Sequence, residues 1–199
     1  MVVLIDNGHG KSSGNSSPDK AVYEYAWSRE MAQRLELALR ERGINVSRIV
    51  IEEKDISISE RCHRVNEVCR AYGVKNCLLV SIHNNASGSD GKWHEANGFS
   101  VFVSKNASTK SKKLASMITD AAIKRGLMGN RSIPKEKFWT WSWTKKDISL
   151  LKNTLCPAVL TENMFQDNHE DVRLLLSEEG KQKIVDLHVE GIINYINSL

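Results

Sequence analysis

The sequence predicts an α/β fold: a single three-layer domain with a mostly parallel (mixed), twisted sheet and helices on both faces. Apolar runs of strand length alternate with longer segments of helical periodicity along the 199 residues, and this alternation is typical of such folds. The strand-length runs are apolar almost throughout, as expected for strands buried on both faces. No internal repeat, linker or low-complexity segment divides the chain, so residues 1–199 are expected to form one domain.

The beginning of the chain predicts two strands that are joined by a loop and a helix. Residues 2–6 form an apolar strand, and residues 7–20 form a loop rich in glycine and serine. A helix is expected over residues 21–42. It ends at Gly43, because glycine readily adopts the backbone conformation of a helix end. Residues 44–51 are expected to form the second strand.

The middle of the chain continues the alternation. Ser59 is predicted to cap a helix that extends to Tyr72. An apolar strand follows over residues 77–82, then a polar loop over residues 84–97 and a strand over residues 98–103. This alternation is typical of a mostly parallel sheet that is covered by helices on both faces.

The last part of the chain predicts a helix over residues 109–125, a final apolar strand over residues 157–161 and two closing helices. Asn168 and Ser177 are the expected N-caps of these two helices, because their short side chains accept hydrogen bonds from free backbone N–H groups. The apolar runs are far shorter than the ~20 residues of a membrane helix, so no transmembrane segment is predicted.

Composition and charge exclude several classes of protein. Hydrophobic residues make up 41% of the chain and charged residues 26%, which argues against intrinsic disorder. The net charge of +4 permits contact with anionic polymers without indicating nucleic acid. We therefore expect no nucleic-acid partner, and we expect a monomer.

The four cysteines are predicted to be buried, reduced thiols. Cys62 and Cys69 are too far apart along one helix to form a disulfide, and neither Cys77 nor Cys156 has a CxxC partner. This is consistent with synthesis in a reducing cytoplasm. Two of the cysteines are expected on a buried helix face, because a spacing of three, four and three residues places four side chains on one side of the helix. These are Cys62, Val65, Cys69 and Tyr72.

Polar side chains gather where three of the predicted strands end. His9 follows the first strand, His83 the central strand and Glu162 the last strand. Functional groups of open α/β sheets collect at the carboxyl ends of the strands, so these residues are expected at one edge of the sheet. Gly8 and Gly10 flank His9 and allow the backbone turns that would direct its imidazole inward.

A carboxylate from the first helix joins this group. Glu24 stands at the head of an apolar helix stripe, where an unpaired charge is costly. No Lys or Arg shares that stripe nearby, so a metal ion would resolve the problem. His9, Glu24 and His83 form the donor set of catalytic zinc with a fourth position left for water, and Glu162 would act as a base on that water. The stripe continues with Trp27, Met31, Leu35 and Ala38.

Each of these residues also has an ordinary structural explanation. A histidine at a strand end is most often hydrogen-bonded, Glu24 could complement the helix dipole, and Glu162 could cap the following segment. The convergence of four such residues on one sheet edge favours the functional interpretation. The remaining histidines are interpreted as solvent-exposed or capping residues: His63, His94, His169 and His188.

Several motifs match one known family in order and spacing over essentially the whole chain. The most specific are LIDNGHG at residues 4–10, Glu24, VSIHNNA at residues 80–86 and LCPAVLTE at residues 155–162. On these motifs the chain resembles the catalytic domain of zinc-dependent N-acetylmuramoyl-L-alanine amidases of the amidase-3 type. Further matches lie at residues 59–66, 98–99 and 111–115.

The resemblance implies a cofactor, a site and a reaction. It implies one zinc ion per chain, held by His9, Glu24 and His83, with Glu162 as the catalytic glutamate. It also implies a peptidoglycan hydrolase in which a zinc-activated water cleaves the amide between N-acetylmuramic acid and L-alanine of the stem peptide.

The chain departs from the family pattern at three places. Asn7 stands where the family usually has proline, which loosens the turn before His9 without removing a ligand. Residues 163–165 replace the family's small residue, glycine and phenylalanine, so the loop after Glu162 is expected to be shaped differently. Residues 104–108 are too few for the inserted helix that blocks the zinc in several relatives, and no separate wall-binding module is expected.

Parts of the sequence also suggest three alternative functions. Residues 10–12 resemble the end of a phosphate-binding loop, but that motif requires a glycine at the position of Ile5. A zinc-dependent peptidase acting on peptidoglycan stem peptides would use the same ligands and remains the alternative. A non-enzymatic binding protein is disfavoured, because the three ligands and Glu162 are all intact.

An aromatic segment is the candidate for substrate binding. Trp139, Trp141 and Trp143 alternate and would face one way in an extended segment. Their rings suit sugars and alanine side chains, and Arg131 could meet a stem-peptide carboxylate. Asn85 is placed to hydrogen-bond the peptide. A tryptophan face packed against the core is an equally weighted alternative.

No secretory signal is visible before the first strand, so synthesis in the cytoplasm is expected. The expected substrate, peptidoglycan or muropeptides, lies outside that compartment. Two routes to the cell wall remain open for a bacterial or phage protein. One is endolysin-like release through a membrane lesion, and the other is export by a signal encoded upstream of this sequence.

Overall fold

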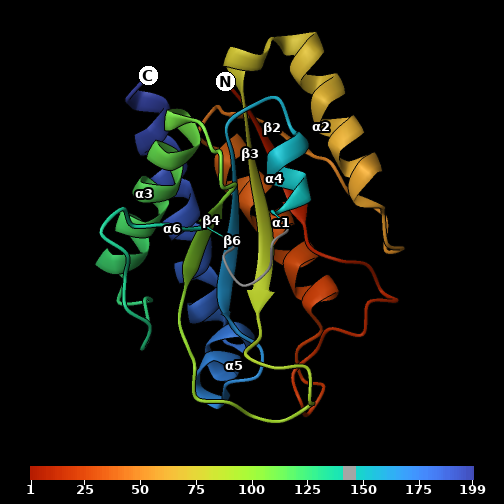
Figure 1. Ribbon diagram of the computed structural model, residues 1–199, viewed down its shortest axis with the longest axis vertical. Coiled ribbons are helices and arrows are strands. Elements are labelled where there is room, and N and C mark those ends of the chain that lie inside the picture. The colour runs from red at the N-terminus through yellow and green to blue at the C-terminus, as the bar shows by residue number, and fades with distance from the viewer. Residues whose placement is uncertain (141–146) are drawn as a thin grey trace.

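The predicted α/β architecture is confirmed by a computed structural model, which describes residues 1–140 and 147–199. A six-stranded sheet with the order β2-β1-β3-β6-β4-β5 forms the middle layer of this described part (Figure 1). Its strands are β1 (Val2–Asn7), β2 (Asn45–Arg48), β3 (Cys77–Asn85), β4 (Ser100–Val103), β5 (Trp139–Thr140) and β6 (Ala158–Phe165).

The sheet is mostly parallel, as expected. β1 pairs in parallel with β2 and β3, and β3 pairs in parallel with β6. β4 runs antiparallel to β6 and parallel to β5, which makes the sheet mixed. The carboxyl ends of β1, β3 and β6 therefore lie at the same edge, at the end of the molecule opposite both chain termini (Figure 1).

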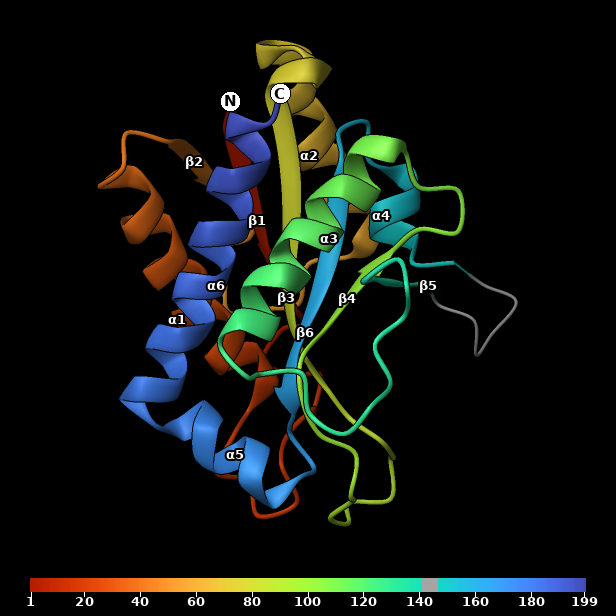
Figure 2. The same ribbon diagram turned by 90° about the vertical axis from the view of Figure 1, so that its left-hand side faces the viewer.

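Helices cover both faces of the sheet. Figure 2 shows α1, α3 and α6 on the face toward the viewer, with α2 and α4 on the other face and α5 near the carboxyl edge. None of the helices in the described residues is long and apolar enough to cross a membrane. The bounds are α1 (Glu24–Arg40), α2 (Ile58–Tyr72), α3 (Thr109–Lys124), α4 (Ser149–Asn153), α5 (His169–Leu176) and α6 (Glu178–Asn197), with a 3-10 turn at Val74–Asn76.

The near-continuous apolar strands follow from this layering. In β1 alternate side chains enter different cores: Val3 and Ile5 pack with α1 and α6, whereas Val2 and Leu4 pack with α2. All four side chains are buried, because successive residues of a strand point to opposite faces and both faces are covered. Packing on both faces of the sheet therefore holds β1 in place, and His9 follows the end of this strand.

Two strands are longer than predicted. β3 was expected to end at Ile82 and β6 at Thr161, but their pairing continues through His83 opposite Glu162, and the strands reach Asn85 and Phe165. The hydrogen bonds of a parallel strand pair are made by the backbone and do not require apolar side chains. The two strands therefore continue beyond the apolar runs from which they were predicted. His83 and Glu162 therefore stand within the strands and not on the loops that follow.

The helix ends confirm two of the predicted caps and correct a third. Asn168 and Ser177 accept backbone N–H bonds at the starts of α5 and α6. Ser57, not Ser59, caps α2, because the Ser57 hydroxyl accepts the N–H of Glu60. All four cysteines are buried and free, as predicted. Tyr72 was expected on their buried face and is instead 59% exposed, since α2 ends there.

The interpretation of His188 as a solvent-exposed or capping residue is wrong. His188 lies on α6 with 1% of its surface exposed. Its Nδ1 lies 2.7 Å from the carbonyl oxygen of Ile184 and its Nε2 lies 3.0 Å from the hydroxyl oxygen of Thr161 on β6. Burial lowers the pKa of His188 to about 4, because the low-dielectric interior disfavours the imidazolium.

This buried histidine is expected to make the protein sensitive to acid. Between pH 6.5 and 4 the unfolded chain binds a proton at His188 that the folded chain does not bind. The free energy of unfolding should therefore fall by about 3 kcal/mol as the pH drops across this interval. Urea unfolding at several pH values should show a shallower decline for His188→Gln, whereas the exposed His63→Gln should behave as the parent. Equal declines in all three proteins would contradict this assignment.

Candidate metal centre and active site

His9 is held in an unusual backbone conformation after β1. Its φ of 58° lies in the left-handed region, which is costly for a residue with a Cβ atom. The guanidinium groups of Arg29 and Arg61 each donate a hydrogen bond of 3.1 Å to its carbonyl oxygen. Gly8 is required beside it, because a Cβ atom there would lie 2.5 Å from Nδ1 of His83. The loop is thus built to hold the two imidazoles close together.

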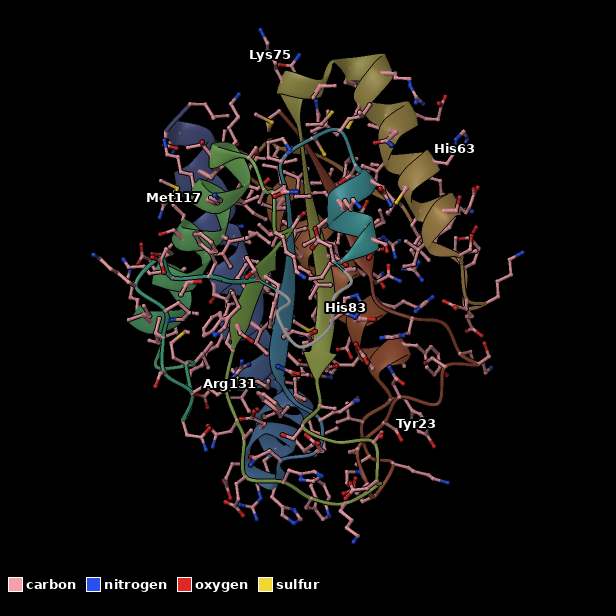
Figure 3. All side chains as sticks on the ribbon, in the orientation of Figure 1. Tyr23, His63, Lys75, His83, Met117 and Arg131 are labelled. Atoms are coloured by element: carbon pink, nitrogen blue, oxygen red, sulfur yellow. The ribbon has the colours of Figure 1, made fainter. Side chains whose placement is uncertain are left out.

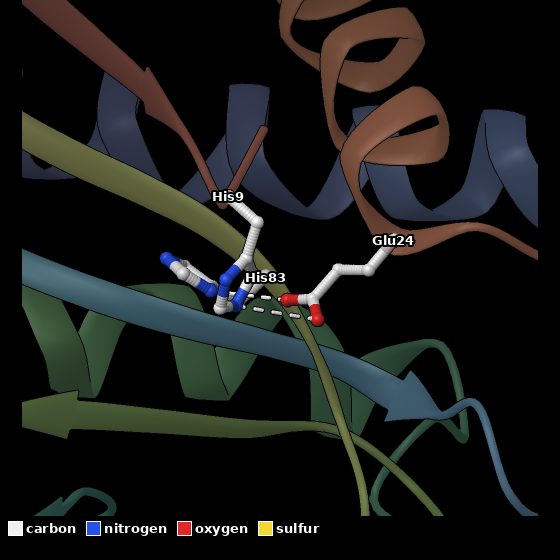
Figure 4. Close-up of side chains that lie close together, drawn as sticks. All are labelled: His9, Glu24 and His83. Atoms are coloured by element: carbon white, nitrogen blue, oxygen red, sulfur yellow. Dashed lines mark hydrogen bonds and ion pairs between the residues drawn. The ribbon is translucent and has the colours of Figure 1, made fainter. Parts of the chain in front are cut away.

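Glu24 joins the histidines from the first turn of α1, where 2% of its surface is exposed. Its Oε1 lies 3.0 Å from Nδ1 of His83 and accepts the backbone N–H of Asn84 at 3.0 Å. Its Oε2 lies 3.4 Å from Nε2 of His9 and accepts a 3.0 Å hydrogen bond from Nδ2 of Asn15. The same Nδ2 lies 3.0 Å from Nε2 of His9. Figure 4 shows the two rings converging on the carboxylate.

The three side chains fit a zinc ion. One donor atom from each of His9, Glu24 and His83 lies within 4.8 Å of the others, and no other His, Cys, Asp or Glu group in the described residues is arranged in this way. Two ligands of tetrahedral zinc are about 3.3 Å apart when each bond is about 2.0–2.1 Å. The distance from Oε1 of Glu24 to Nδ1 of His83 is 3.0 Å, and the distance from Oε2 to Nε2 of His9 is 3.4 Å. Both are close to that spacing.

The charges within this cluster attract each other. Burial opposes ionisation of Glu24, but hydrogen bonds from His83 and His9 outweigh it and hold the pKa of this carboxyl well below its usual range. Burial likewise opposes the protonated form of His83, but the bond to Glu24 raises the pKa of this imidazole to about 9. The Glu24 carboxyl group is thus ionised, and its negative charge stabilises positive charge next to it, as a cation-binding site requires.

Glu162 stands on β6 directly opposite His83 in the strand pairing. It is 8% exposed, and its Oε2 has no hydrogen-bond partner among the described residues. Burial raises its pKa to about 8, although His83 and Arg131 lower it in part. A carboxyl group that gains and loses a proton near neutral pH suits general acid–base chemistry.

Three cavities lie at or next to this centre. A cavity of about 500 Å³ is lined by His9, Glu24, His83 and Glu162, together with the loops around residues 13–20 and 86–92. A second cavity of about 410 Å³ is lined by Asn85, Ala86, Ser87, Ala96, Phe102, Arg131 and Phe165. Asn85 and Ala86 line both the first and the second of these cavities. The third, of about 400 Å³, is lined by His9, His83 and Arg61, among others.

The predicted substrate residues are only partly brought to these cavities. Figure 3 labels Arg131. Its guanidinium lies over the rings of Trp139, at 5.4 Å, and Phe165, at 5.9 Å. Trp139 is half-buried and packs against Phe102. Its ring is therefore held in place as a surface on which the guanidinium of Arg131 lies. The predictions for Trp141 and Trp143 lie outside the described residues.

Sequence reasoning did not single out two residues that hold the cluster. Asn15 comes from an irregular loop, and no pattern marks it. Arg61 is 2% exposed and pairs with Asp6 at 2.6 Å. It stands four residues before Val65 and eight before Cys69, so its place on the buried face of α2 was a usable signal.

Comparisons with known proteins agree with this geometry. A family model described as N-acetylmuramoyl-L-alanine amidase matches residues 3–194. The endolysin of Bacillus phage SPP1 is 29% identical over 98% of this chain and 66% of its own length. The protein named "Probable cell wall amidase LytH" of Staphylococcus epidermidis is 26% identical over 98% of this chain and 58% of its own length. The chain thus spans less than two thirds of either relative.

Solved structures share the fold. The N-acetylmuramoyl-L-alanine amidase of Clostridium difficile 630 superposes with a TM-score of 0.81 at 22% identity, covering 100% of this chain and 97% of that one. The catalytic domain of the CD27L endolysin, which targets Clostridia difficile, superposes with a TM-score of 0.70 at 26% identity, covering 98% and 97%. The likeness therefore extends over the whole chain.

Proposed function

The chain belongs to the N-acetylmuramoyl-L-alanine amidase family, and from this premise we propose that it hydrolyses the amide between N-acetylmuramic acid and L-alanine in peptidoglycan. Residues 1–199 would form one catalytic domain. The observation that carries the proposal is the cluster of His9, Glu24 and His83 with Glu162 opposite His83 on the adjoining strand.

We propose that His9, Glu24 and His83 hold one zinc ion per chain. The spacing of their donor atoms supports this, and two imidazoles with one carboxylate are a known ligand set of catalytic zinc. A zinc ion there would polarise the substrate carbonyl and activate a water molecule. The backbone N–H of Asn84 and the amide of Asn15 would keep the Glu24 carboxylate in place, because hydrogen bonds to a ligand fix its orientation.

Glu162 would move the proton. Glu162 lines the cavity of about 500 Å³, and its carboxylate would accept a proton from the attacking water. The same carboxyl group would then pass that proton to the nitrogen of the leaving alanine, so that the amine departs uncharged. The raised pKa of Glu162 supports both steps, since neither protonation state is strongly disfavoured near neutral pH.

Arg131 and Asn85 would bind the peptide part of the substrate. Arg131 lines the cavity of about 410 Å³. Its guanidinium is stacked on Phe165 and Trp139, which would hold it in position to bind a carboxylate. We also propose Trp139, Trp141 and Trp143 as substrate-binding residues, of which Trp141 and Trp143 lie outside the described residues. The position of Trp139 behind Arg131 supports a positioning role for that ring.

Arg131→Met is expected to raise KM by about tenfold with little change in kcat. The loss of one charge-assisted hydrogen bond accounts for a change of this size. Methionine can still pack against Phe165 and Trp139, so the melting temperature should be nearly unchanged. Arg173→Met, an exposed residue on α5, is the matched control and should leave KM unaltered. A fall in melting temperature with an unchanged KM would show that Arg131 only supports the fold.

The products of digestion test the proposed reaction directly. Purified muramyl peptides are incubated with the zinc-loaded protein and analysed by mass spectrometry. An amidase releases a peptide with a free N-terminal alanine and leaves the lactyl carboxylate on the sugar. A peptidase acting on stem peptides, the alternative, would leave alanine attached to the sugar, and that product would refute the assignment.

We further propose that the protein acts on the cell wall as a monomer. Relatives named an endolysin and a probable cell wall amidase support this site of action. Phage-type release and export remain the two proposed routes, and the reading frame upstream of Met1 decides between them. An in-frame signal peptide would exclude phage-type release, and a sedimentation experiment tests the monomer.

A further inference from the structure

The pairing of β6 with β3 is interrupted immediately after Glu162. The two strands pair regularly up to His83 opposite Glu162, and the next paired residues are Asn85 and Phe165. One residue of β3, Asn84, therefore stands against two residues of β6, which makes a β-bulge. Bulges occur often beside active sites, where they redirect a side chain.

The bulge changes the face of the sheet to which the next side chain belongs. Ala158 and Leu160 pack in the core shared with α2, and the alternation along a strand places Glu162 on the same face. In a regular strand the side chain of residue 164 would follow on that face. Met164 instead packs in the core shared with α1 and α6, with 1% of its surface exposed. The bulge thus keeps this side chain away from the face of Glu162.

This arrangement requires an unfavourable backbone conformation at Met164. Its φ of 66° lies in the left-handed region, which is costly for a residue with a Cβ atom. Such a conformation persists only where the surrounding structure imposes it. The contacts that impose it are therefore expected beside Met164 on β6 and across from it on β3.

Two asparagine side chains join β3 and β6 at the bulge. Nδ2 of Asn163 donates to the carbonyl oxygen of His83 at 3.0 Å and to that of Thr161 at 3.2 Å. Nδ2 of Asn84 donates to the carbonyl oxygen of Asn163 at 2.7 Å. Each side chain thus bonds the backbone of the opposite strand. Because carbonyl oxygens only accept, the Asn163 amide cannot turn over without losing both of these bonds.

Asn163 acts within the protein and not on the substrate. It is 0% exposed, and it lines none of the three cavities at the metal cluster. A buried amide is costly unless it is hydrogen-bonded. The bonds of this amide connect the backbone of His83 to the residue that follows Glu162, so they join the two strands at the point where the reacting groups stand.

We propose that Asn163 is a positioning residue, which holds the bulge and thereby fixes the Glu162 carboxyl group relative to His83. This inference rests on the proposed amidase function, in which Glu162 and the metal cluster act on the same water. Misplacement of a reacting group by about 1 Å can lower turnover about 100-fold. Asn163 therefore contributes to kcat without touching the substrate.

Asn163→Leu removes the donors and keeps a side chain of similar size. The kcat for muramyl peptides should fall about 10- to 100-fold. KM should be nearly unchanged, because no residue that lines a cavity is altered. The zinc content should stay at about one ion per chain, since the three proposed ligands are intact. A folded variant with the kcat of the parent would overturn the proposal.

Hydrogen exchange gives a readout that does not depend on activity. The backbone N–H of Gln166 donates to the carbonyl oxygen of Asn85 at 2.8 Å, just beyond the bulge. In zinc-loaded Asn163→Leu this amide should exchange about tenfold faster than in the parent, because loss of the cross-strand bonds promotes local opening. Equal exchange would show that Asn163 does not hold this end of β6, and the proposal would be wrong.

The same readout separates this proposal from the proposed function. If the parent protein does not hydrolyse muramyl peptides, the amidase function is refuted. The exchange of the Gln166 amide in Asn163→Leu then still decides whether Asn163 holds the bulge.

Ile192→Val is the matched control for a general loss of stability. Ile192 is 0% exposed and lies in the core toward the C-terminal end of α6, at the end of the molecule opposite the metal cluster (Figure 1). Loss of a buried methylene lowers the melting temperature without touching the bulge. The control should keep the kcat of the parent and the slow exchange at Gln166. A comparable fall of kcat in this control would mean that stability alone limits turnover, which contradicts a positioning role.

Met164→Gly, combined with Asn163→Leu, tests the link between the two residues. Glycine adopts a positive φ readily, so the bulge would no longer depend on the bonds from Asn163. The double variant should regain most of the lost kcat, although its melting temperature should fall further because a buried side chain is lost. If kcat and melting temperature fell together, Asn163 would have only a structural role.

Asn163→Ser replaces Asn163→Leu if the latter does not fold. The serine hydroxyl keeps one donor and cannot make both carbonyl bonds at once. Its kcat should be severalfold below that of the parent, with faster exchange at Gln166. A kcat equal to that of the parent would refute the role of Asn163.

Discussion

Glu162→Gln is expected to retain zinc and to lose about 100- to 10,000-fold in kcat, the usual contribution of a general acid–base group. Glutamine has almost the same shape as glutamate but cannot take up and release the proton. None of the three metal ligands is altered, so the zinc content should stay at about one ion per chain. Hydrolysis of muramyl peptides and elemental analysis of the same preparation measure both quantities.

The matched control is Glu178→Gln on the surface of α6, where the carboxylate pairs with Arg34 and Lys181. That variant should retain the parent's activity. Near-normal turnover in Glu162→Gln would mean that another group moves the proton. Loss of zinc from it would instead mean that Glu162 supports the metal cluster.

His83→Ala is expected to abolish zinc binding at stoichiometric zinc and to reduce hydrolysis to background. Removing one of three protein ligands leaves only His9 and Glu24, which is too few for a stable catalytic zinc site. In the parent, added zinc should raise the melting temperature, because a ligand that binds only the folded state stabilises it. In the variant, that rise should disappear.

His63→Ala is the control for this experiment. His63 lies on the exposed face of α2 and is interpreted as a solvent-facing residue. It should keep one zinc per chain and the full thermal response. If His83→Ala bound zinc as tightly as the parent, the assignment of the ligands would be wrong, whatever its activity.

The sequence was sufficient to predict that His9, Glu24 and His83 would meet. Two of them follow apolar runs that predict strands of a mostly parallel sheet, and the carboxyl ends of such strands lie at one edge. Glu24 was found because a charge at the head of a buried helix stripe needs a partner. These inferences depend on short-range periodicity, which the sequence displays directly.

The contacts that hold the cluster could not be predicted in the same way. The pairing of Arg61 with Asp6 joins residues far apart in the chain, and the hydrogen bond from Asn15 to Glu24 depends on the path of an irregular loop. The role of His188 depends on which residue of β6 faces α6. Such contacts arise from packing between elements, and no local pattern encodes them.

The pairing of His83 with Glu162 has a consequence for how this enzyme could change. Neighbouring strands are about 4.8 Å apart. The hydrogen-bonded pairing of β3 with β6 therefore sets the distance between His83, a proposed metal ligand, and Glu162, the proposed general base. The loops that border the cavities contribute nothing to that distance. Insertions or exchanges around residues 86–97 can therefore alter which peptides are accepted while the reacting groups keep their separation. Specificity can evolve independently of the chemistry in such a scaffold.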